Sequence, residues 1–224
     1  NHVQGMDHSY IYVNDDFDKA ETALRPFVDA GLATLVNWKP PAQHAGGFLY
    51  QMAQQNSCLL RARGRVHWVA LHDSDEFFYA AKPWEDVAQM LHKFVHNGVD
   101  EQIGAVQART WFYGMHGDGA EQQAKQGATE TANLRLARCI ARDKGPIYVD
   151  REKLIARPKN VRYVSVHMVT LGMPTLTLDA ESEMLLVHYK DVEHRRYNMT
   201  DTSMMEWVAP VQAVLDGVVK EGRF

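Results

Sequence analysis

A largely apolar run at residues 66–72 ends in four polar residues, Asp73-Ser74-Asp75-Glu76. A short apolar run of this kind is typical of a strand buried on both faces of a sheet. The carboxyl ends of such strands are where α/β folds bind metal ions and phosphates. Side chains two apart on a strand point the same way, so we expect Asp73 and Asp75 to converge. Converging carboxylates are candidate ligands for Mn²⁺ or Mg²⁺, which take hard oxygen ligands.

The same spacing in Asp16-Phe17-Asp18 has a different interpretation. An apolar rhythm typical of an amphipathic helix follows it, at Phe17, Ala20, Leu24, Phe27 and Val28. Asp15 or Asp16 is therefore expected to cap that helix, because a carboxylate accepts hydrogen bonds from the free N–H groups of the first turn.

The rest of the chain alternates strand and helix patterns through its first hundred residues. Strands are expected at residues 9–13, 34–38, 66–71, 103–109, 147–149, 161–169 and 184–189. Helices are expected from residue 17 to 28, from 47 to 61, from 83 to 96 and from 204 to 215. Alternation of this kind predicts βαβ crossovers and an α/β fold with a mostly parallel sheet flanked by helices, although the second half is more mixed.

The bulk numbers fit one domain covering residues 1–224. Of its residues, 46% are hydrophobic and 23% charged, which provides a sizeable core. The net charge of −4, with scattered Lys and Arg, argues against nucleic-acid binding. Cys58 and Cys139 are interpreted as small buried side chains rather than a disulfide or zinc site.

No apolar stretch is long enough to cross a membrane, and no signal peptide is visible. The chain opens at Asn1 without a methionine, so we expect a soluble domain cut from a longer or membrane-anchored protein. The compartment stays open.

Two histidines, His167 and His188, lie in runs that are apolar enough to be buried strands. Either neutral imidazole could complete a Mn²⁺ site, or serve only as a hydrogen-bonded core residue. Beyond His188, the cations Lys190 and Arg195 could stabilise a departing diphosphate. They could equally pair with nearby carboxylates at a solvated helix start.

The glycine-rich stretch at residues 111–119 is expected to be a long surface loop. Its aromatic residues Trp111 and Tyr113 could stack on a sugar ring, with His116 as a polar partner, or could pack down as a plug. Three carboxylates that could deprotonate an acceptor hydroxyl are in or beyond this stretch, and the sequence does not choose among Asp118, Glu121 and Glu130.

Several segments, taken in order, resemble the family 92 glycosyltransferases and related GT-A enzymes. The matching segments are residues 5–15, 54–59, 68–77, 164–167 and 187–190. They run in family order over nearly the whole chain, which is more specific than any one motif. The acidic strand end and the segment Val187-His188-Tyr189-Lys190 carry most of the resemblance.

The resemblance implies a GT-A-type, Rossmann-like sheet and an inverting transferase that moves a sugar from a nucleotide donor to a glycan or glycoconjugate acceptor. It implies that Asp73 and Asp75 hold a Mn²⁺-bridged (or Mg²⁺-bridged) diphosphate and that His188 completes the metal shell. Asn14 and Asp15 would lie near the nucleotide. Such sheets usually open with a strand and a helix upstream of the region that begins at Gly5, and that strand helps hold the nucleobase; we expect this chain to be a trimmed domain that lacks them.

Two other functions stay open at this point. A metal-dependent phosphohydrolase could use the same carboxylates, but the haloacid-dehalogenase type expects Thr or Val soon after the second Asp, where this chain has Glu76-Phe77-Phe78. A non-catalytic carbohydrate-binding or scaffolding domain of the same fold is the other, although the acidic cluster is complete.

Overall fold

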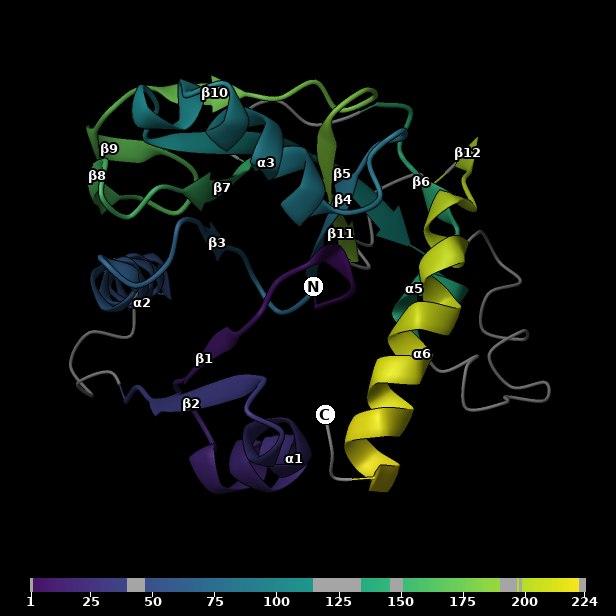
Figure 1. Cartoon of the computed structure of the whole chain (residues 1–224). Helices are drawn as coiled ribbons and strands as arrows, with labels where there is room; N and C mark the ends of the chain where they lie inside the picture. Colours follow the sequence, from purple (N-terminus) through teal and green to yellow (C-terminus); the bar gives the residue numbers. More distant parts are fainter. Residues whose placement is uncertain are drawn as a thin grey trace.

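The computed structural model describes residues 2–39, 47–114, 134–145, 151–189, 197 and 199–221. Figure 1 shows an N-terminal unit of two strands and a helix, a larger sheet, and a C-terminal helix alongside. Within the described ranges, no helix is both long and apolar enough to cross a membrane.

The N-terminal unit begins with the 3-10 turn η1 (His2–Gln4) and contains β1 (Ser9–Val13), α1 (Phe17–Asp29) and β2 (Ala33–Asn37). The two strands pair in parallel as a separate sheet. The Asp16 side chain accepts a hydrogen bond from the Lys19 N–H at 3.0 Å and caps α1. The interpretation of Asp16-Phe17-Asp18 as a helix start is therefore confirmed.

The next segment provides α2 (Gly47–Ala62), β3 (Val69–Leu71), β4 (Glu76–Ala80), α3 (Val87–His96) and the 3-10 turn η2 (Val99–Glu101). The expected strand at residues 66–71 is shorter in the structure, and Val66 is exposed. Asp86 caps α3 by accepting from the Gln89 N–H at 2.7 Å, so this helix begins four residues after the expected Pro83.

The ten-residue strand β5 (Ala105–Gly114) is the spine of the larger sheet. Its neighbours are β6 (Ala141–Arg142), β7 (Lys153–Ala156), β10 (Thr175–Thr177) and β11 (Met184–Tyr189). Farther out, β4 pairs with β11, β3 with β7, and β12 (Met199–Thr200) with β6. Because β5 runs through Gly114, the expected surface loop is wrong over residues 111–114.

Shorter elements complete the described fold. A separate hairpin is formed by β8 (Val161–Val164) and β9 (Val169–Gly172), while α5 (Arg135–Arg138) precedes β6. The chain continues through η5 (Ser203–Trp207), α6 (Val208–Asp216) and the π-helical segment η6 (Gly217–Glu221). The strand expected at residues 147–149 lies outside the described residues.

The α/β class is confirmed, but the mostly parallel sheet is wrong. In the larger sheet, β5 pairs in parallel with β10 and β11, whereas its pairings with β6 and β7 are antiparallel. The pairs β4–β11, β3–β7 and β6–β12 are antiparallel as well. The antiparallel partners in this sheet are far apart in the sequence, as β4 and β11 are, so the local alternation of strand and helix patterns could not predict their direction.

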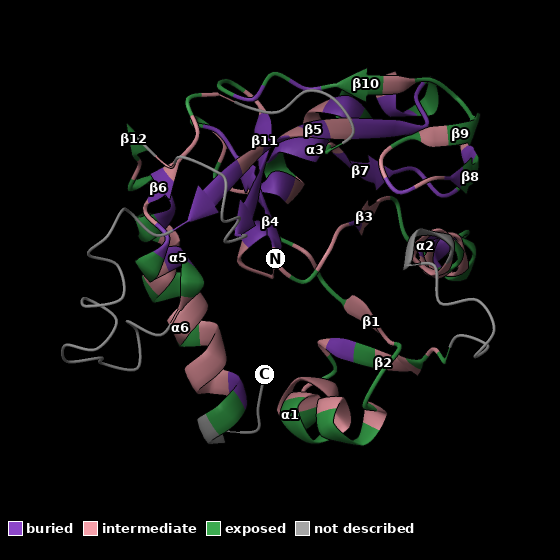
Figure 2. Cartoon of the chain, turned by 180° about the vertical axis from the view of Figure 1, so that it is seen from behind, coloured by how far each residue is buried: buried purple, intermediate pink, exposed green. Residues whose placement is uncertain are grey.

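The centre of the sheet is covered on both faces. Phe78 of β4 and Leu186 of β11 pack in a cluster with α3, whereas Phe77 and Val187, one residue along each strand, pack in a second cluster with η5 and α6. Figure 2 shows β4, β5 and β11 as the buried middle of the molecule. A polar side chain on β4 or β11 must therefore find its partners inside the protein.

Candidate functional site

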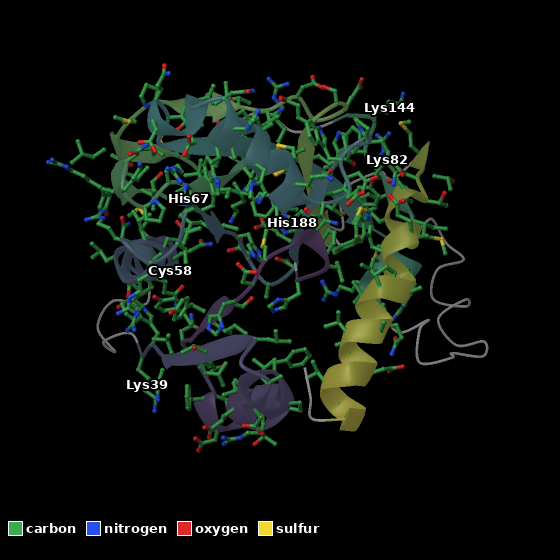
Figure 3. All side chains as sticks on the ribbon, in the orientation of Figure 1. Lys39, Cys58, His67, Lys82, Lys144 and His188 are labelled. Carbon is green, nitrogen blue, oxygen red and sulfur yellow. The ribbon has the colours of Figure 1, made fainter. Side chains whose placement is uncertain are left out.

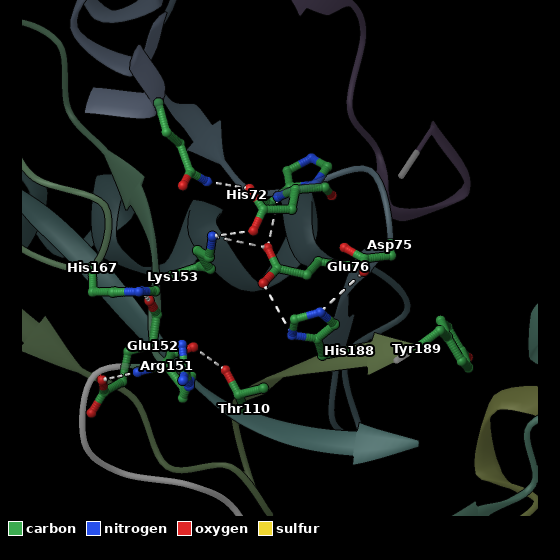
Figure 4. Close-up of polar contacts among 12 residues, drawn as sticks. His72, Asp75, Glu76, Thr110, Arg151, Glu152, Lys153, His167, His188 and Tyr189 are labelled. Carbon is green, nitrogen blue, oxygen red and sulfur yellow. Dashed lines mark hydrogen bonds and ion pairs between the residues drawn. The ribbon is translucent and has the colours of Figure 1, made fainter. Parts of the chain in front are cut away.

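Asp73 and Asp75 lie in the connection between β3 and β4 rather than on a strand. The strand alternation from which we expected them to converge therefore does not apply. Their carboxylates have different partners: Asp73 contacts Lys153, and Asp75 contacts His188. Figure 4 shows Asp75 and Lys153 on opposite sides of Glu76.

Asp73 is held by two donors. Its Oδ2 lies 2.8 Å from the Lys153 Nζ, and the Gln51 side-chain amide donates to its Oδ1. Lys153 comes from β7, the antiparallel neighbour of β3, and its side chain is only 1% exposed. The Asp73 side chain is 39% exposed, so this carboxylate is anchored from inside while part of it still meets solvent.

Glu76 is the buried residue at the centre of the cluster formed by Asp73, Asp75, Glu76, Lys153 and His188. Its Oε2 accepts from the Asp73 N–H at 2.7 Å and lies 3.4 Å from the Lys153 Nζ. Its Oε1 lies 3.4 Å from the Nδ1 of His188. Burial raises the pKa of Glu76, and the neighbouring Lys153 ammonium opposes that rise.

His188 comes from β11 and faces two carboxylates. Its Nε2 lies 3.2 Å from the Asp75 Oδ2, while its Nδ1 faces Glu76. Its ring stacks on Phe112 of the adjacent strand, with 4.8 Å between ring centroids. The Asp75 backbone is fixed as well, because its carbonyl accepts from the Tyr189 N–H at 2.9 Å. Figure 3 shows His188 near the middle of the molecule.

The structure separates the two histidines that the sequence left as alternatives. His167 lies between β8 and β9, with its Nδ1 2.8 Å from the Glu152 carbonyl oxygen. Burial lowers the pKa of His167. Figure 4 shows His167 beyond Lys153, on the side away from Asp75. Of the two histidines, His188 is therefore the one beside Asp75.

The pair Asp75 and His188 fits a divalent cation of the Mn²⁺ or Mg²⁺ type. A carboxylate oxygen and an imidazole nitrogen 3.2 Å apart could both face one ion, and both are accepted by Mn²⁺. Among the residues that the structure describes, no group of three or more His, Cys, Asp or Glu is arranged as a metal site. Two protein ligands suit a cation that takes its other ligands from phosphates and water.

The two aromatic residues expected to stack on an acceptor lie on β5. Trp111 is partly buried and packs against the Arg142 guanidinium, whose carbon is 4.0 Å from the ring centroid. Tyr113 is fully buried in the cluster that contains Tyr189. The prediction that Tyr113 stacks on a sugar is therefore wrong, because core side chains cover its ring.

Asn14 and Asp15 are exposed directly after β1. The helix α2 links β1 to the acidic cluster, since Tyr12 donates to the Ser57 hydroxyl at 3.1 Å and Gln51 donates to Asp73. Contacts of α2 therefore connect β1 with Asp73, and the nucleotide contact expected of Asn14 and Asp15 stays a prediction.

The remaining predicted site residues lie outside the described residues: His116, Asp118, Glu121, Glu130, Lys190 and Arg195. The segments that carry them follow Gly114 of β5 and Tyr189 of β11. Those two strands are parallel neighbours, with Tyr189 in register with Tyr113.

Sequence reasoning missed Glu76, Lys153 and Gln51. Glu76 carried one usable signal, because it is a charged residue at the start of the run Phe77-Phe78-Tyr79-Ala80. A charge in such a run needs a buried partner. Lys153 has the corresponding position before Leu154-Ile155-Ala156. Nothing local pointed to Gln51, which is a polar residue on a helix.

A cavity of about 460 Å³ lies elsewhere, lined by Trp84, His92, Lys93, Val95 and His96. It is open, none of its lining residues belongs to the acidic cluster, and Lys93 is paired with Glu183. We therefore place the candidate site at the cluster of Asp73, Asp75, Glu76, Lys153 and His188.

Comparison with known proteins adds an independent result. A search of curated proteins found no match for the chain. The model of glycosyltransferase family 92 matches residues 1–216 of the 224. The match includes every described residue of the acidic cluster. The chain therefore belongs to glycosyltransferase family 92.

Proposed function

We propose that this protein is a metal-dependent inverting glycosyltransferase of the GT-A type. It would move a sugar from a nucleotide-diphosphate donor to a hydroxyl group of a glycan acceptor. The observation that carries the proposal is the 3.2 Å approach of His188 Nε2 to Asp75 Oδ2 in a chain of a glycosyltransferase family.

At the donor end, Asp75 and His188 would hold Mn²⁺ or Mg²⁺. When bound, the cation would neutralise the diphosphate and make it a better leaving group. Asp73, fixed by Lys153 and Gln51, keeps an exposed part of its carboxylate for the donor, where its role would be to orient the nucleotide. Asn14 and Asp15 are proposed to contact the nucleotide, and Lys190 and Arg195 the departing diphosphate.

At the acceptor end, an inverting transfer needs one general base. The acceptor hydroxyl oxygen forms a bond to the anomeric carbon as the bond to the diphosphate breaks, and the hydroxyl proton goes to the base. A carboxylate among Asp118, Glu121 and Glu130 is proposed for this role. Trp111 and His116 are proposed to contact the acceptor.

The test is transfer from nucleotide sugars. Purified protein is incubated with Mn²⁺ and a panel of uridine- and guanosine-diphosphate sugars, with and without glycan acceptors, and products are identified by mass spectrometry. We expect transfer that chelation abolishes and added Mn²⁺ restores, and NMR should show an inverted anomeric centre.

Two variants sharpen this test. Asp75→Asn should abolish transfer, whereas Asp18→Asn, in the acidic motif of identical spacing at the start of α1, should transfer normally. Full transfer by the Asp75→Asn variant would refute the site. Donor hydrolysis at the same rate with and without acceptor would instead indicate the phosphohydrolase.

A further inference from the structure

We propose that Glu76 is a positioning residue that fixes the imidazole of His188 as the Nδ1–H tautomer, with the Nε2 lone pair directed at the cation. This inference rests on the proposed function, because it assigns His188 to the metal. Glu76 itself stays behind His188 and does not contact the ion.

The fold places these two residues opposite each other. Glu76 and His188 are partners in the antiparallel pairing of β4 and β11. The Glu76 side chain is 1% exposed and that of His188 is 11% exposed, so water has little access to the space between them. Phe112, stacked on the imidazole, limits ring rotation.

The two oxygens of Glu76 contact different groups. Oε2 faces two donors, the Asp73 N–H and the Lys153 ammonium. Oε1 lies 3.4 Å from the Nδ1 of His188. An ionised carboxylate can serve all three neighbours, because it accepts at both oxygens and donates at neither.

These contacts of the two Glu76 oxygens determine which nitrogen of His188 carries the proton. With Glu76 accepting, Nδ1 is the donor and Nε2 keeps its lone pair on the side of Asp75. A metal-binding histidine typically donates its other N–H to a carboxylate or carbonyl in this way. The same carboxylate accepts from the backbone N–H of Asp73, so it also connects the segment between β3 and β4 to His188.

The substitution Glu76→Gln tests this division of contacts between the two oxygens, because it hardly changes the shape of the side chain. An amide has one acceptor oxygen and one donor nitrogen. Two donors compete for the oxygen on the Lys153 side, so we expect the amide oxygen to turn there and the NH₂ group to face His188 Nδ1. His188 would then carry its proton on Nε2, donate to Asp75 and lose its lone pair for the cation.

The readout is Mn²⁺ binding in the presence of a nucleoside diphosphate, measured by titration calorimetry. We expect Glu76→Gln to weaken Mn²⁺ by about 10- to 100-fold, the usual cost of losing such a supporting group. If Glu76 acts through His188, the double variant with His188→Ala should bind Mn²⁺ no more weakly than His188→Ala alone. A general loosening of the fold would instead add to the effect of His188→Ala.

The chain supplies a matched control. Glu183 contacts a lysine ammonium and a backbone N–H, as Glu76 does, but with separate oxygens: one contacts the Lys93 Nζ and the other accepts from the Asp179 N–H at 2.9 Å. No histidine is among these contacts. Glu183→Gln should leave Mn²⁺ affinity unchanged. An equal loss in both variants would overturn the proposal.

A measurement on the unaltered protein keeps the proposal testable if Glu76→Gln fails to fold. Pulsed electron paramagnetic resonance of bound Mn²⁺, with ¹⁵N-labelled histidine, should show coupling to one nitrogen that His188→Ala removes. Absence of that coupling would overturn the assignment of Glu76. Unaltered protein that binds no Mn²⁺ would reject the metal-dependent function as well, whereas additive effects of the two substitutions would reject only the role of Glu76.

Discussion

Lys153 and Glu76 form an ion pair inside the protein, with 3.4 Å between Nζ and Oε2 and both side chains only 1% exposed. The pair joins β7 to β4, two strands that do not pair with each other. Lys153 also contacts Asp73, which is partly solvated. The ammonium is therefore the buried countercharge for both carboxylates.

Lys153→Met should destabilise the protein by about 3–5 kcal/mol, because it leaves Glu76 buried without its cation. The free energy of unfolding can be measured by urea denaturation followed by circular dichroism. Lys93→Met is the control: its ion pair with Glu183 is more exposed, so its loss should cost about 1 kcal/mol or less.

The double variant Glu76→Leu with Lys153→Met should recover most of the lost stability, since an apolar pair can replace a buried ion pair. Its affinity for Mn²⁺ should remain lower than that of the unaltered protein, because His188 has lost its carboxylate partner. A loss below about 1 kcal/mol in Lys153→Met alone would contradict a buried, uncompensated charge.

Asp75→Asn should change metal binding without changing the fold. The Asp75 side chain is about one-third exposed, and its backbone contact with Tyr189 does not depend on the carboxylate. Melting temperatures are measured with and without Mn²⁺ and a nucleoside diphosphate. Unaltered protein should gain about 2.7 kcal/mol of stability at a ligand concentration 100 times Kd, and the variant should gain almost none.

Asp18→Asn is again the comparison, because it removes a carboxylate of the same spacing at the start of α1. It should show the full stabilisation by Mn²⁺ and nucleotide. Equal stabilisation of the Asp75→Asn variant would remove Asp75 from the metal site.

Loss of two helix caps should have different effects on the free energy of unfolding. Asp16 caps α1, which buries none of its residues fully, whereas Asp86 caps α3, which buries four. Asp86→Ala should lower the free energy of unfolding by about 1 kcal/mol. Asp16→Ala should chiefly speed hydrogen exchange in the first turn of α1. Equal global losses in urea would contradict this difference in coupling to the core.

The elements that the sequence predicted well are those with a local signal. The apolar spacing of α1 and its acidic cap gave its bounds to within a residue, and the continuous run of β11 gave that strand. The strand β4 was missed because its apolar run, Phe77-Phe78-Tyr79-Ala80, is short and lies directly after the acidic motif. Its side chains enter two different cores, so the alternation of polar and apolar residues that marks a surface strand is absent.

The site was predictable only in part, for a related reason. The sequence marked Asp73, Asp75 and His188, but pairing depends on strand register, which places His188 opposite Glu76 and beside Asp75. Lys153 follows Glu76 by 77 positions in the sequence, and only the antiparallel placement of β7 against β3 and β5 brings it to the cluster. Contacts of that sequence separation carry no local pattern.

Asp201 provides a test of pH dependence away from the site. Burial alone would raise its pKa, but hydrogen bonds from the Ser203 hydroxyl and N–H and from the Arg142 guanidinium outweigh burial and hold the pKa below its ordinary value. A carboxylate with a lowered pKa in the folded state stabilises the protein above the pKa of the unfolded chain, about 3.9. That stability is lost as the pH falls through the folded-state pKa.

Asp201→Asn should therefore be less stable than unaltered protein by about 1.5–3 kcal/mol at pH 7, the usual value for hydrogen bonds to a charged group. The difference should stay constant down to about pH 5 and shrink below about pH 4, as unaltered Asp201 becomes protonated. Urea denaturation at pH 7, 5, 4 and 3.5 measures it. Asp29→Asn, at an exposed position on α1, should differ little at any of these pH values. A difference that grows toward low pH would mean that the folded-state pKa of Asp201 is raised, and that burial rather than Arg142 and Ser203 governs this carboxylate.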